Sequence, residues 1–290
     1  SRELRQELSD SSKIIKKLAG SSQVLLKLKE DILDFSQSDA FVLIEGETGS
    51  GKTLVAHALH AVSQKMAKAL ITVHCSAYDA PTLSRRLFGP IEEADNFLPA
   101  FEEAKGGTLI LEDIERLPID LQGKLLDKLE VLENSSEIRL IAISNHSSPT
   151  FTKKVIRDDL YFRLSAFKLT IPPLASRRLD IAPLVDLMLS KHSGSLGHEI
   201  GITADAMNEL MHYSWPGNVR ELENVISRAV VMSDGEHIDA CHILLDDIKP
   251  NDTWQEQGKQ TASAMHRLIA ADPFQHLAGN SSGVLGSTVK

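Results

Sequence analysis

A glycine-rich turn between a short apolar run and an amphipathic segment constrains the fold more than any other feature. The apolar run FVLI (41–44) leads into GETGSGKT (46–53). Apolar residues then recur at helical spacing, at Leu54, Ala58, Leu59 and Val62. This order predicts a strand, a loop and a helix. The turn also matches the pattern G-x-x-x-x-G-K-[ST] in full, which is typical of a phosphate-binding loop.

The residue types of this loop suit a phosphate anion. Glycines let backbone N–H groups turn inward around phosphate oxygens, and the N-terminus of the following helix adds a favourable dipole. We expect Lys52 to reach the β- and γ-phosphates of a nucleotide and the Thr53 hydroxyl to be a ligand of Mg²⁺. The predicted cofactor-binding residues of the loop are Gly46, Glu47, Thr48, Gly49, Ser50, Gly51, Lys52 and Thr53. The alternative, a merely flexible Gly/Ser turn, is disfavoured by the strand–loop–helix setting.

Short apolar runs alternate with amphipathic segments over much of the chain. The runs are 41–44, 70–73, 108–111, 138–143 and 167–171. This alternation predicts an α/β domain with a largely parallel sheet flanked by helices. After Pro172 and Pro173 the periodicity becomes helical to about residue 245, which predicts a small all-helical second domain.

Two adjacent acids, Glu112 and Asp113, end the apolar run of TLILEDIERL (108–117). In phosphate-loop proteins, a carboxylate at the end of a neighbouring buried strand holds Mg²⁺, and a second acid can orient the attacking water. We therefore expect Glu112 to be a metal ligand together with Thr53, and Asp113 to act on the water. The alternative is that the two acids simply begin a solvated loop.

Charge and cysteine content limit the possible partners and the compartment. The 290-residue chain has a formal net charge of −9, which argues against a broad basic face for nucleic acid. Cys75 and Cys241 show neither a disulfide pattern nor metal-ligand spacing, which favours a reduced setting. No apolar run approaches the roughly 18 residues of a membrane span, and the N-terminus lacks a signal-peptide core. We expect a cytoplasmic protein that does not associate with membranes.

Several further signatures occur in order along the chain. They are LAGSS (18–22), LFG (87–89), GGTLILEDI (106–114), IRDDLYFRL (156–164), IPPLASRRLDI (171–181) and WPGNVRELENVISRA (215–229). With them, residues 19–248 resemble the AAA+ central domain of bacterial sigma-54 activators, the nitrogen-regulator and dicarboxylate-transport-regulator group. The resemblance implies an AAA+ P-loop NTPase fold with a helical lid. It also implies ATP and Mg²⁺ bound between subunits, and a homo-oligomeric ring, usually a hexamer.

The resemblance assigns roles to four further residues. Arg157 and Arg163 match the arginine fingers that a subunit presents to its neighbour's ATP. Asn145 matches the sensor at the end of the fourth strand, and Arg220 matches the lid sensor near the γ-phosphate. A finger supplied in trans can be worth about 10³–10⁵ in rate, so hydrolysis would depend on assembly. Taken alone, each arginine could instead be a surface or structural charge.

The order of the two acids departs from the family. The family usually has Asp followed by Glu, whereas this chain has Glu112 followed by Asp113. A one-residue slip cannot restore the order, because it would turn buried side chains of the strand outward. Asp113 is one methylene shorter than Glu, and a displacement of about 1 Å at such a group can lower the rate on the order of 10²-fold. We therefore predict ATP binding with slow hydrolysis.

A second departure is His74, where the family commonly has Asn before the Cys of the second strand. In the family this Asn restrains the catalytic glutamate. We expect His74 either to hydrogen-bond Asp113 or to pack at the end of the strand.

Both family output loops are short in this chain. The connection PIEEADNFLPAFEEAK (90–105) lacks the Gly-Ala-Phe-Thr-Gly-Ala motif that grips sigma-54, and EVLENSSE (130–137) runs almost directly into the fourth strand. These features favour a regulatory module in which ATP controls assembly. The alternative is an active ATPase that remodels sigma-54 RNA polymerase, with the sigma factor as partner. A small-molecule phosphate-loop kinase is disfavoured, because WPGNVREL and the paired arginines have no reason to occur there.

Four segments are expected on this basis. Residues 1–18 form a linker helix, 19–175 the nucleotide-binding α/β domain, and 176–248 the helical lid. Residues 249–290 form a polar tail, either a Ser/Gly-rich coil or the approach to a DNA-binding helix-turn-helix. A receiver domain before Ser1 would make the whole protein a response regulator of a two-component system. DNA would then be contacted only through a C-terminal domain that is not evident in this chain.

Overall fold

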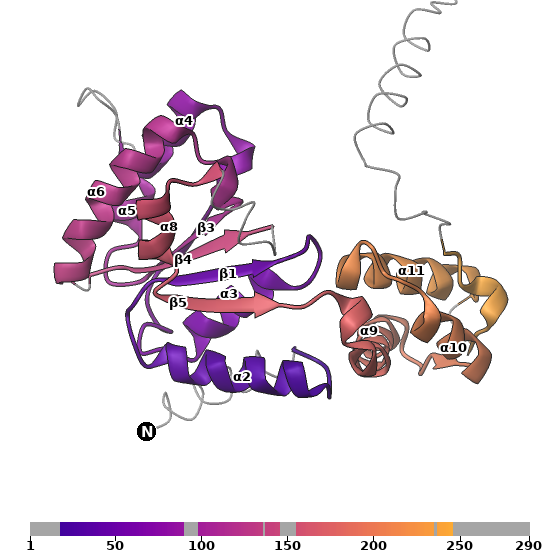
Figure 1. The fold of residues 1–290 in the computed structure, drawn as a ribbon. Helices are drawn as coiled ribbons and strands as arrows, with labels where there is room; N and C mark the ends of the chain where they lie inside the picture. Colours follow the sequence, from indigo (N-terminus) through magenta and orange to yellow (C-terminus); the bar gives the residue numbers. More distant parts are fainter. Residues whose placement is uncertain (1–17, 90–97, 136, 146–154, 235–236, 246–290) are drawn as a thin grey trace, which may run out of the picture. The chain divides into compact units, whose positions relative to one another are not determined.

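A parallel five-stranded sheet is the centre of the α/β part of the chain (Figure 1). The computed structural model describes residues 18–89, 98–135, 137–145, 155–234 and 237–245. The strands are β1 (Val42–Gly46), β2 (Leu70–His74), β3 (Thr108–Glu112), β4 (Arg139–Ser144) and β5 (Phe167–Ile171), in the order β2-β3-β4-β1-β5. All neighbours pair in parallel, so the carboxyl ends of β1, β3 and β4 lie at one edge of the sheet. The predicted fold class and its five strands are confirmed.

Successive side chains of the central strands enter two separate hydrophobic cores. On β3, Leu109 and Leu111 join one core, whereas Ile110 joins the other. Figure 1 shows α2 and α3 on one face of the sheet, and α4, α5, α6 and α8 on the other. The bounds are α2 (Gln23–Ser36), α3 (Lys52–Ala61), α4 (Ala80–Phe88), α5 (Ala100–Glu103), α6 (Ile119–Ser135) and α8 (Asp158–Leu164). A sheet covered on both faces explains why its strands are continuous apolar runs rather than alternating ones.

The lid consists of α9 (Ile181–Leu196), α10 (Ala204–His212) and α11 (Asn218–Met232) around a third core. Trp215 is 1% exposed at its centre, and its indole N–H donates to the Leu210 carbonyl oxygen at 2.8 Å. The predicted helical lid is confirmed, and it also contains two short strands. The short strands β6 (Gly201–Ile202) and β7 (His237–Ile238) pair in parallel. Two residues are too few to show a strand periodicity, so the sequence did not reveal them.

A buried arginine connects the sheet to the ends of two helices. Arg139, at the start of β4, is 0% exposed and donates to the carbonyl oxygens of Phe35 at 2.7 Å and Leu59 at 3.4 Å. These carbonyls belong to the last turns of α2 and α3, where no intrahelical donor is available. Burial lowers the pKa of the Arg139 guanidinium, and the negative ends of the two helix dipoles favour its charge. The contact fixes α3, the helix that begins at Lys52.

A buried aspartate holds the N-terminal signature against the start of the lid. Asp180 is 0% exposed and accepts hydrogen bonds from the backbone N–H groups of Ser21 at 2.8 Å and Ser22 at 2.7 Å. The Ser22 hydroxyl also donates to Asp180 at 2.8 Å, and it caps α2 by accepting from the Leu25 N–H at 3.2 Å. Residues 21–22 and 180, far apart in sequence, thus form one polar contact.

Three predicted segments lie outside the described residues: almost all of the linker helix 1–18, the polar tail 249–290, and residues 90–97 of the first output loop. The second output loop is described except for Ser136, with α6 ending at Ser135 and β4 beginning at Arg139. Among the described helices, none combines the length and the apolar character needed to cross a membrane.

Candidate functional site

The glycine-rich loop joins β1 to α3 at the carboxyl edge of the sheet. Gly49 and Gly51 have φ angles of 78° and 104°, which side-chain-bearing residues rarely adopt. A Cβ atom on Gly49 would lie 2.3 Å from the Gly217 carbonyl oxygen of the lid. Gly51 is the N-cap of α3 and has no side chain to occupy the free N–H groups there. The loop therefore presents a helix N-terminus and backbone amides to an anion.

Lys52 occupies the centre of this loop. It is 6% exposed, and its ammonium group donates to the carbonyl oxygens of Gly46 at 2.9 Å and Glu47 at 2.8 Å. Burial lowers the pKa of Lys52 to about 8, and the carboxylates of the site, with Glu115 foremost, oppose that shift. Phosphate oxygens close to Lys52 would favour its charged form.

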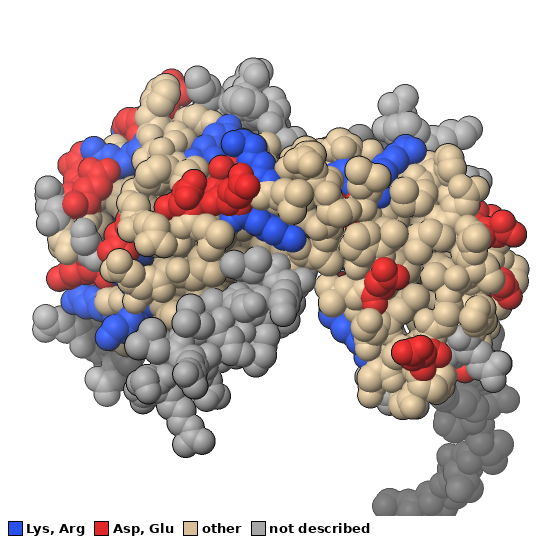
Figure 2. Space-filling model, turned by 90° about the horizontal axis from the view of Figure 1, so that it is seen from below, with Lys and Arg blue, Asp and Glu red and all other residues tan. Residues whose placement is uncertain are grey.

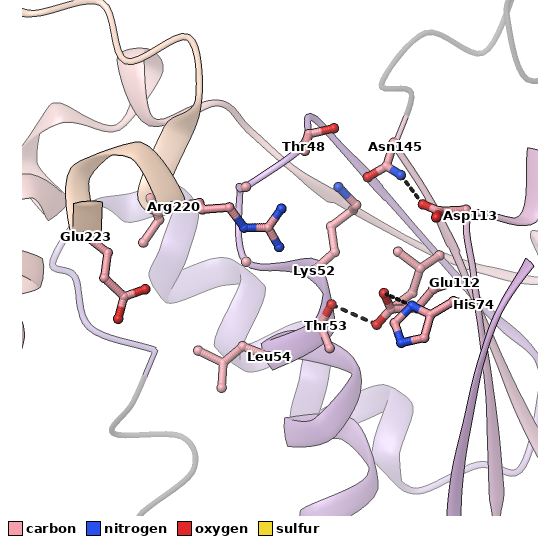
Figure 3. Close-up of a pocket in the computed structure, with 14 residues that line it drawn as sticks. Thr48, Lys52, Thr53, Leu54, His74, Glu112, Asp113, Asn145, Arg220 and Glu223 are labelled. Atoms are coloured by element: carbon pink, nitrogen blue, oxygen red, sulfur yellow. Dashed lines mark hydrogen bonds and ion pairs between the residues drawn. The ribbon is translucent and has the colours of Figure 1, made fainter. Parts of the chain in front are cut away.

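Glu112, at the end of β3, faces the loop (Figure 3). Its Oε1 accepts a hydrogen bond from the Thr53 hydroxyl at 2.8 Å, and its Oε2 lies 3.1 Å from Nδ1 of His74. A hydroxyl oxygen and a carboxylate oxygen, brought together from two elements, are the ligand types that Mg²⁺ prefers. Among the described residues, no three His, Cys, Asp or Glu side chains gather to hold a metal by themselves. The residues thus fit Mg²⁺ bound partly through phosphate oxygens and water, as is usual for this ion.

Asp113 points to a different part of the site. Its carboxylate accepts a hydrogen bond from the Ser76 hydroxyl. It also accepts one from the side-chain amide of Asn145 at the end of β4 (Figure 3). The backbone of Asp113 has a φ of 56°, a conformation that non-glycine residues adopt mostly at turns and functional sites. The two adjacent acids therefore have separate partners, one at the phosphate loop and one at the β4 end.

The expectation for His74 was wrong. Its imidazole neither bonds Asp113 nor packs at the strand end; its side chain is 54% exposed and faces Glu112. The cause is strand register: His74 of β2 pairs directly with Glu112 of β3, so their side chains lie on the same side of the sheet. Ser76, two residues on, is the group that reaches Asp113. Nothing in the sequence distinguished Ser76 from an ordinary turn serine.

Glu115 was also missed by the sequence analysis. It is 6% exposed, and its Oε1 accepts from the backbone N–H of Asn145 at 3.2 Å. In sequence it is one more acid in a polar loop after β3. Its burial shows instead that it holds the end of β4, where Asn145 contacts Asp113.

Arg220 of α11 lies across the pocket from Lys52 (Figure 3). The pocket has a volume of about 570 Å³, and its lining includes Lys52, Glu112, Asp113, Asn145 and Arg220. A smaller cavity of about 40 Å³ beside the loop is lined mostly by apolar side chains. Among these are Leu18, Leu25, Leu54, Ile171 and Val219. A pocket lined by several charged side chains beside an apolar cavity suits a phosphate chain joined to a flat base.

Arg157 and Arg163 do not line the pocket of their own chain. Arg157, the N-cap of α8, donates to the Asp159 carboxylate at 3.1 and 2.7 Å. Arg163 lies 3.3 Å from Glu130 and 3.6 Å from Glu133 of α6. The structure therefore brings together the loop residues, the two acids, Asn145 and Arg220, and leaves the two arginines apart from them.

Known proteins with similar sequences are transcription regulators. Residues 18–170 match the family model "Sigma-54 interaction domain", and residues 175–261 match the "AAA+ ATPase lid domain". The chain is 38% identical over 239 residues to the transcriptional regulatory protein ZraR of Klebsiella oxytoca, covering 76% of this chain and 54% of ZraR. It is 32% identical over 302 residues to FlbD of Caulobacter vibrioides, covering 92% of this chain and 66% of FlbD. The chain thus spans about half of ZraR and two thirds of FlbD.

A solved structure agrees with these sequence matches. The crystal structure of NtrX from Brucella abortus in complex with ATP superimposes with a TM-score of 0.70 at 28% identity, covering 96% of this chain and 67% of NtrX. The fold and the resemblance expected from the sequence are both confirmed. With its sheet, phosphate loop and lid, and with more than half of its length matched, the chain belongs to the Sigma-54 interaction domain family, the AAA+ P-loop NTPase domain of sigma-54 activator-type transcription regulators.

Proposed function

We propose that this chain is the nucleotide-controlled module of a cytoplasmic transcription regulator and that it binds ATP with Mg²⁺ at the phosphate loop. The observation that carries the proposal is the 2.8 Å contact between Thr53 and Glu112, which joins the loop hydroxyl to a strand-end carboxylate beside Lys52. The related NtrX has been crystallised with ADP and with ATP, which supports a nucleotide as the ligand. The apolar cavity beside the loop would take the base after its lining side chains move apart.

Six residues of the pocket have roles in this proposal. Lys52 and Arg220 bind phosphate oxygens, and Thr53 with Glu112 would hold Mg²⁺. When bound, the ion neutralises charge on the phosphate oxygens. Asp113, held by Asn145, orients the attacking water, but its short side chain makes hydrolysis slow.

Ring assembly is the second part of the proposal. Arg157 and Arg163 both lie on or at the start of α8, away from the pocket of their own chain. We place them at the nucleotide of a neighbouring copy, in a hexamer-like ring. Both would first have to leave their present carboxylate partners, so that assembly and nucleotide state become coupled.

Calorimetry with Mg–ADP and Mg–ATP tests the binding. The wild-type chain should release heat on binding, and Lys52→Ala should weaken the affinity at least about ten-fold, because a charged donor to the phosphates is lost. Thermal unfolding of both proteins without nucleotide serves as the folding control. If wild type and Lys52→Ala gave the same signal, or neither gave any, the proposed site would be wrong.

A second candidate function is the remodelling of sigma-54 RNA polymerase, which membership of the family favours. The order of Glu112 and Asp113 and the two short connections favour the regulatory module. The second connection leaves few residues between α6 and β4, since α6 ends at Ser135 and β4 begins at Arg139. So short a link offers little projecting surface for a partner. On the face shown in Figure 2, basic and acidic side chains of the described residues are interspersed, so this face has no broad basic patch of the kind that binds DNA.

Capture of sigma-54 distinguishes the two functions. Immobilised chain should retain no sigma-54 in the presence of ATP or of ADP with aluminium fluoride, because the gripping motif is missing from 90–105. A family member that carries the Gly-Ala-Phe-Thr-Gly-Ala motif provides the positive control. Stable retention by this chain with the transition-state analogue would establish the remodelling function instead.

A further inference from the structure

The carbonyl groups of the phosphate loop are held by donors from the lid and from the hinge, residues 172–180 between β5 and α9. The carbonyl oxygen of Thr48 accepts from the side-chain amide of Asn218 at 3.2 Å. The next carbonyl, of Gly49, accepts from the backbone N–H of Arg220 at 3.3 Å. The one after it, of Ser50, accepts from the guanidinium of Arg177 at 2.7 Å. Three consecutive peptide groups of the loop are therefore anchored by a distant stretch of chain.

Anchoring a carbonyl also orients an amide. In a trans peptide group, the C=O and the following N–H point in opposite directions within one plane. Holding the oxygens of residues 48–50 toward the hinge and lid therefore turns the N–H groups of residues 49–51 the other way. The Ser50 N–H donates to the Glu47 carbonyl oxygen at 3.2 Å, so the N–H groups of Gly49 and Gly51 are the ones that belong to the cradle that would bind phosphate. Because these groups are already oriented, the loop loses less conformational entropy when it binds the anion.

Asn218 is the centre of these contacts. It is 0% exposed, and its side chain bonds to three residues in two separate parts of the chain. Its Oδ1 accepts from the Leu174 N–H of the hinge at 2.7 Å, and its Nδ2 donates to the Glu47 carboxylate at 3.0 Å as well as to Thr48. Its φ of 56° is an unfavourable conformation that the surrounding bonds stabilise.

Close backbone contact at the same place supports this role. A Cβ atom on Gly49 would lie 2.3 Å from the Gly217 carbonyl oxygen, so lid and loop touch without an intervening side chain. Arg177 is 6% exposed and is buried behind the loop, where its guanidinium also lies 4.0 Å from Asp180. Neither Asn218 nor Arg177 lines the pocket that would hold the phosphates.

We propose that Asn218 and Arg177 are positioning residues for the phosphate cradle: they hold the loop carbonyls outward, so that docking of the lid sets the affinity for nucleotide phosphates. This inference rests on the proposed binding of ATP at the loop. The lid then has a structural role in the anion site. This role is separate from any contact of the Arg220 side chain with nucleotide.

The decisive experiment measures the binding of Mg–ADP and of inorganic pyrophosphate to the 290-residue chain by calorimetry. Asn218→Gly removes the side chain and tolerates the positive φ; it should weaken both ligands by the same factor, about ten-fold. Arg177→Met should weaken pyrophosphate by the same factor; Mg–ADP is not compared for this variant, because Arg177 also lines the apolar cavity that we propose for the base. The exposed neighbour supplies the matched control, Arg178→Met, which should leave both affinities unchanged.

A second pair of variants changes the loop instead of the lid, and therefore controls for misfolding of the lid. Glu47→Gln keeps an acceptor for Asn218, whereas Glu47→Ala removes it, and both lose the same charge. The Ala variant should therefore bind Mg–ADP a few-fold more weakly than the Gln variant. Equal affinities for all of these proteins would overturn the inference, as would a loss for ADP without a loss for pyrophosphate.

Hydrogen exchange separates this inference from the proposed function. The Arg220 N–H lies in the first turn of α11 and bonds to the loop rather than within its helix, so its protection reports docking. Without any nucleotide, this amide should exchange faster in Asn218→Gly than in wild type, and at the wild-type rate in Arg178→Met. If wild type bound neither Mg–ADP nor pyrophosphate, the proposed function would fail, and the exchange rate alone would decide whether Asn218 holds lid and loop together.

Discussion

Exchanging the two acids, in the double variant Glu112→Asp/Asp113→Glu, should raise the ATP turnover of the chain by about 10²-fold. Asp113 is hydrogen-bonded to Ser76 and Asn145, and it is one methylene shorter than the Glu that the family usually has at the position we propose for orienting the attacking water. The double variant restores that length. Steady-state phosphate release at saturating Mg–ATP measures the effect.

Single variants show which acid limits the rate. Asp113→Glu alone should supply most of the gain, because it changes the group that orients water. Glu112→Asp alone should give little, because it keeps a carboxylate at the proposed metal position beside the Thr53 hydroxyl. Affinity for Mg–ADP should be the same in Asp113→Glu as in wild type, which separates chemistry from binding. Turnover in wild type as fast as in the double variant would refute the predicted effect of the acid order.

Removing either proposed finger, by Arg157→Ala or Arg163→Ala, should lower turnover by about 10³-fold or more. The measurement is best made in the double-acid variant, where the starting rate is high enough to follow. Nucleotide affinity should persist, since neither arginine lines the pocket of its own chain. The control is Arg116→Ala, which changes an exposed arginine of the α/β domain. It should leave the rate unchanged.

Mixing experiments show whether the fingers act between subunits. A Lys52→Ala subunit has no working site of its own but can supply its arginines to a neighbour. Mixed with Arg157→Ala subunits, it should restore part of the lost turnover, and the rate per subunit should rise with protein concentration. The combination of Lys52→Ala and Arg157→Ala in one chain should restore none. Loss without recovery on mixing would show that the arginines serve their own subunit.

The fold could be predicted because its determinants are local. Uninterrupted apolar runs such as 108–111 and 138–143 specify buried strands, and alternation with helical periodicity specifies a parallel sheet. The phosphate loop could be predicted because its function depends on backbone conformations that only glycine adopts easily. The two-residue strands β6 and β7 could not be predicted, because their pairing depends on the packing of the lid.

The partners inside the site depended on tertiary structure. The sequence placed Glu112 and Asp113 side by side, but strand register decided that His74 faces Glu112 and leaves Asp113 to Ser76. Glu115 looked like a surface acid until its burial showed that it holds the end of β4.

Sequence alone thus determined the chain's family, its phosphate loop and the order of its acids, because each is recognised from residues that are adjacent in sequence. Only the tertiary structure decided how that loop is held. Asn218 and Arg177 lie more than a hundred positions from the loop in sequence, and their side chains donate hydrogen bonds to its backbone carbonyl groups. Every residue has a backbone carbonyl, so no sequence pattern identifies the partner of such a bond; the packing of lid against loop does.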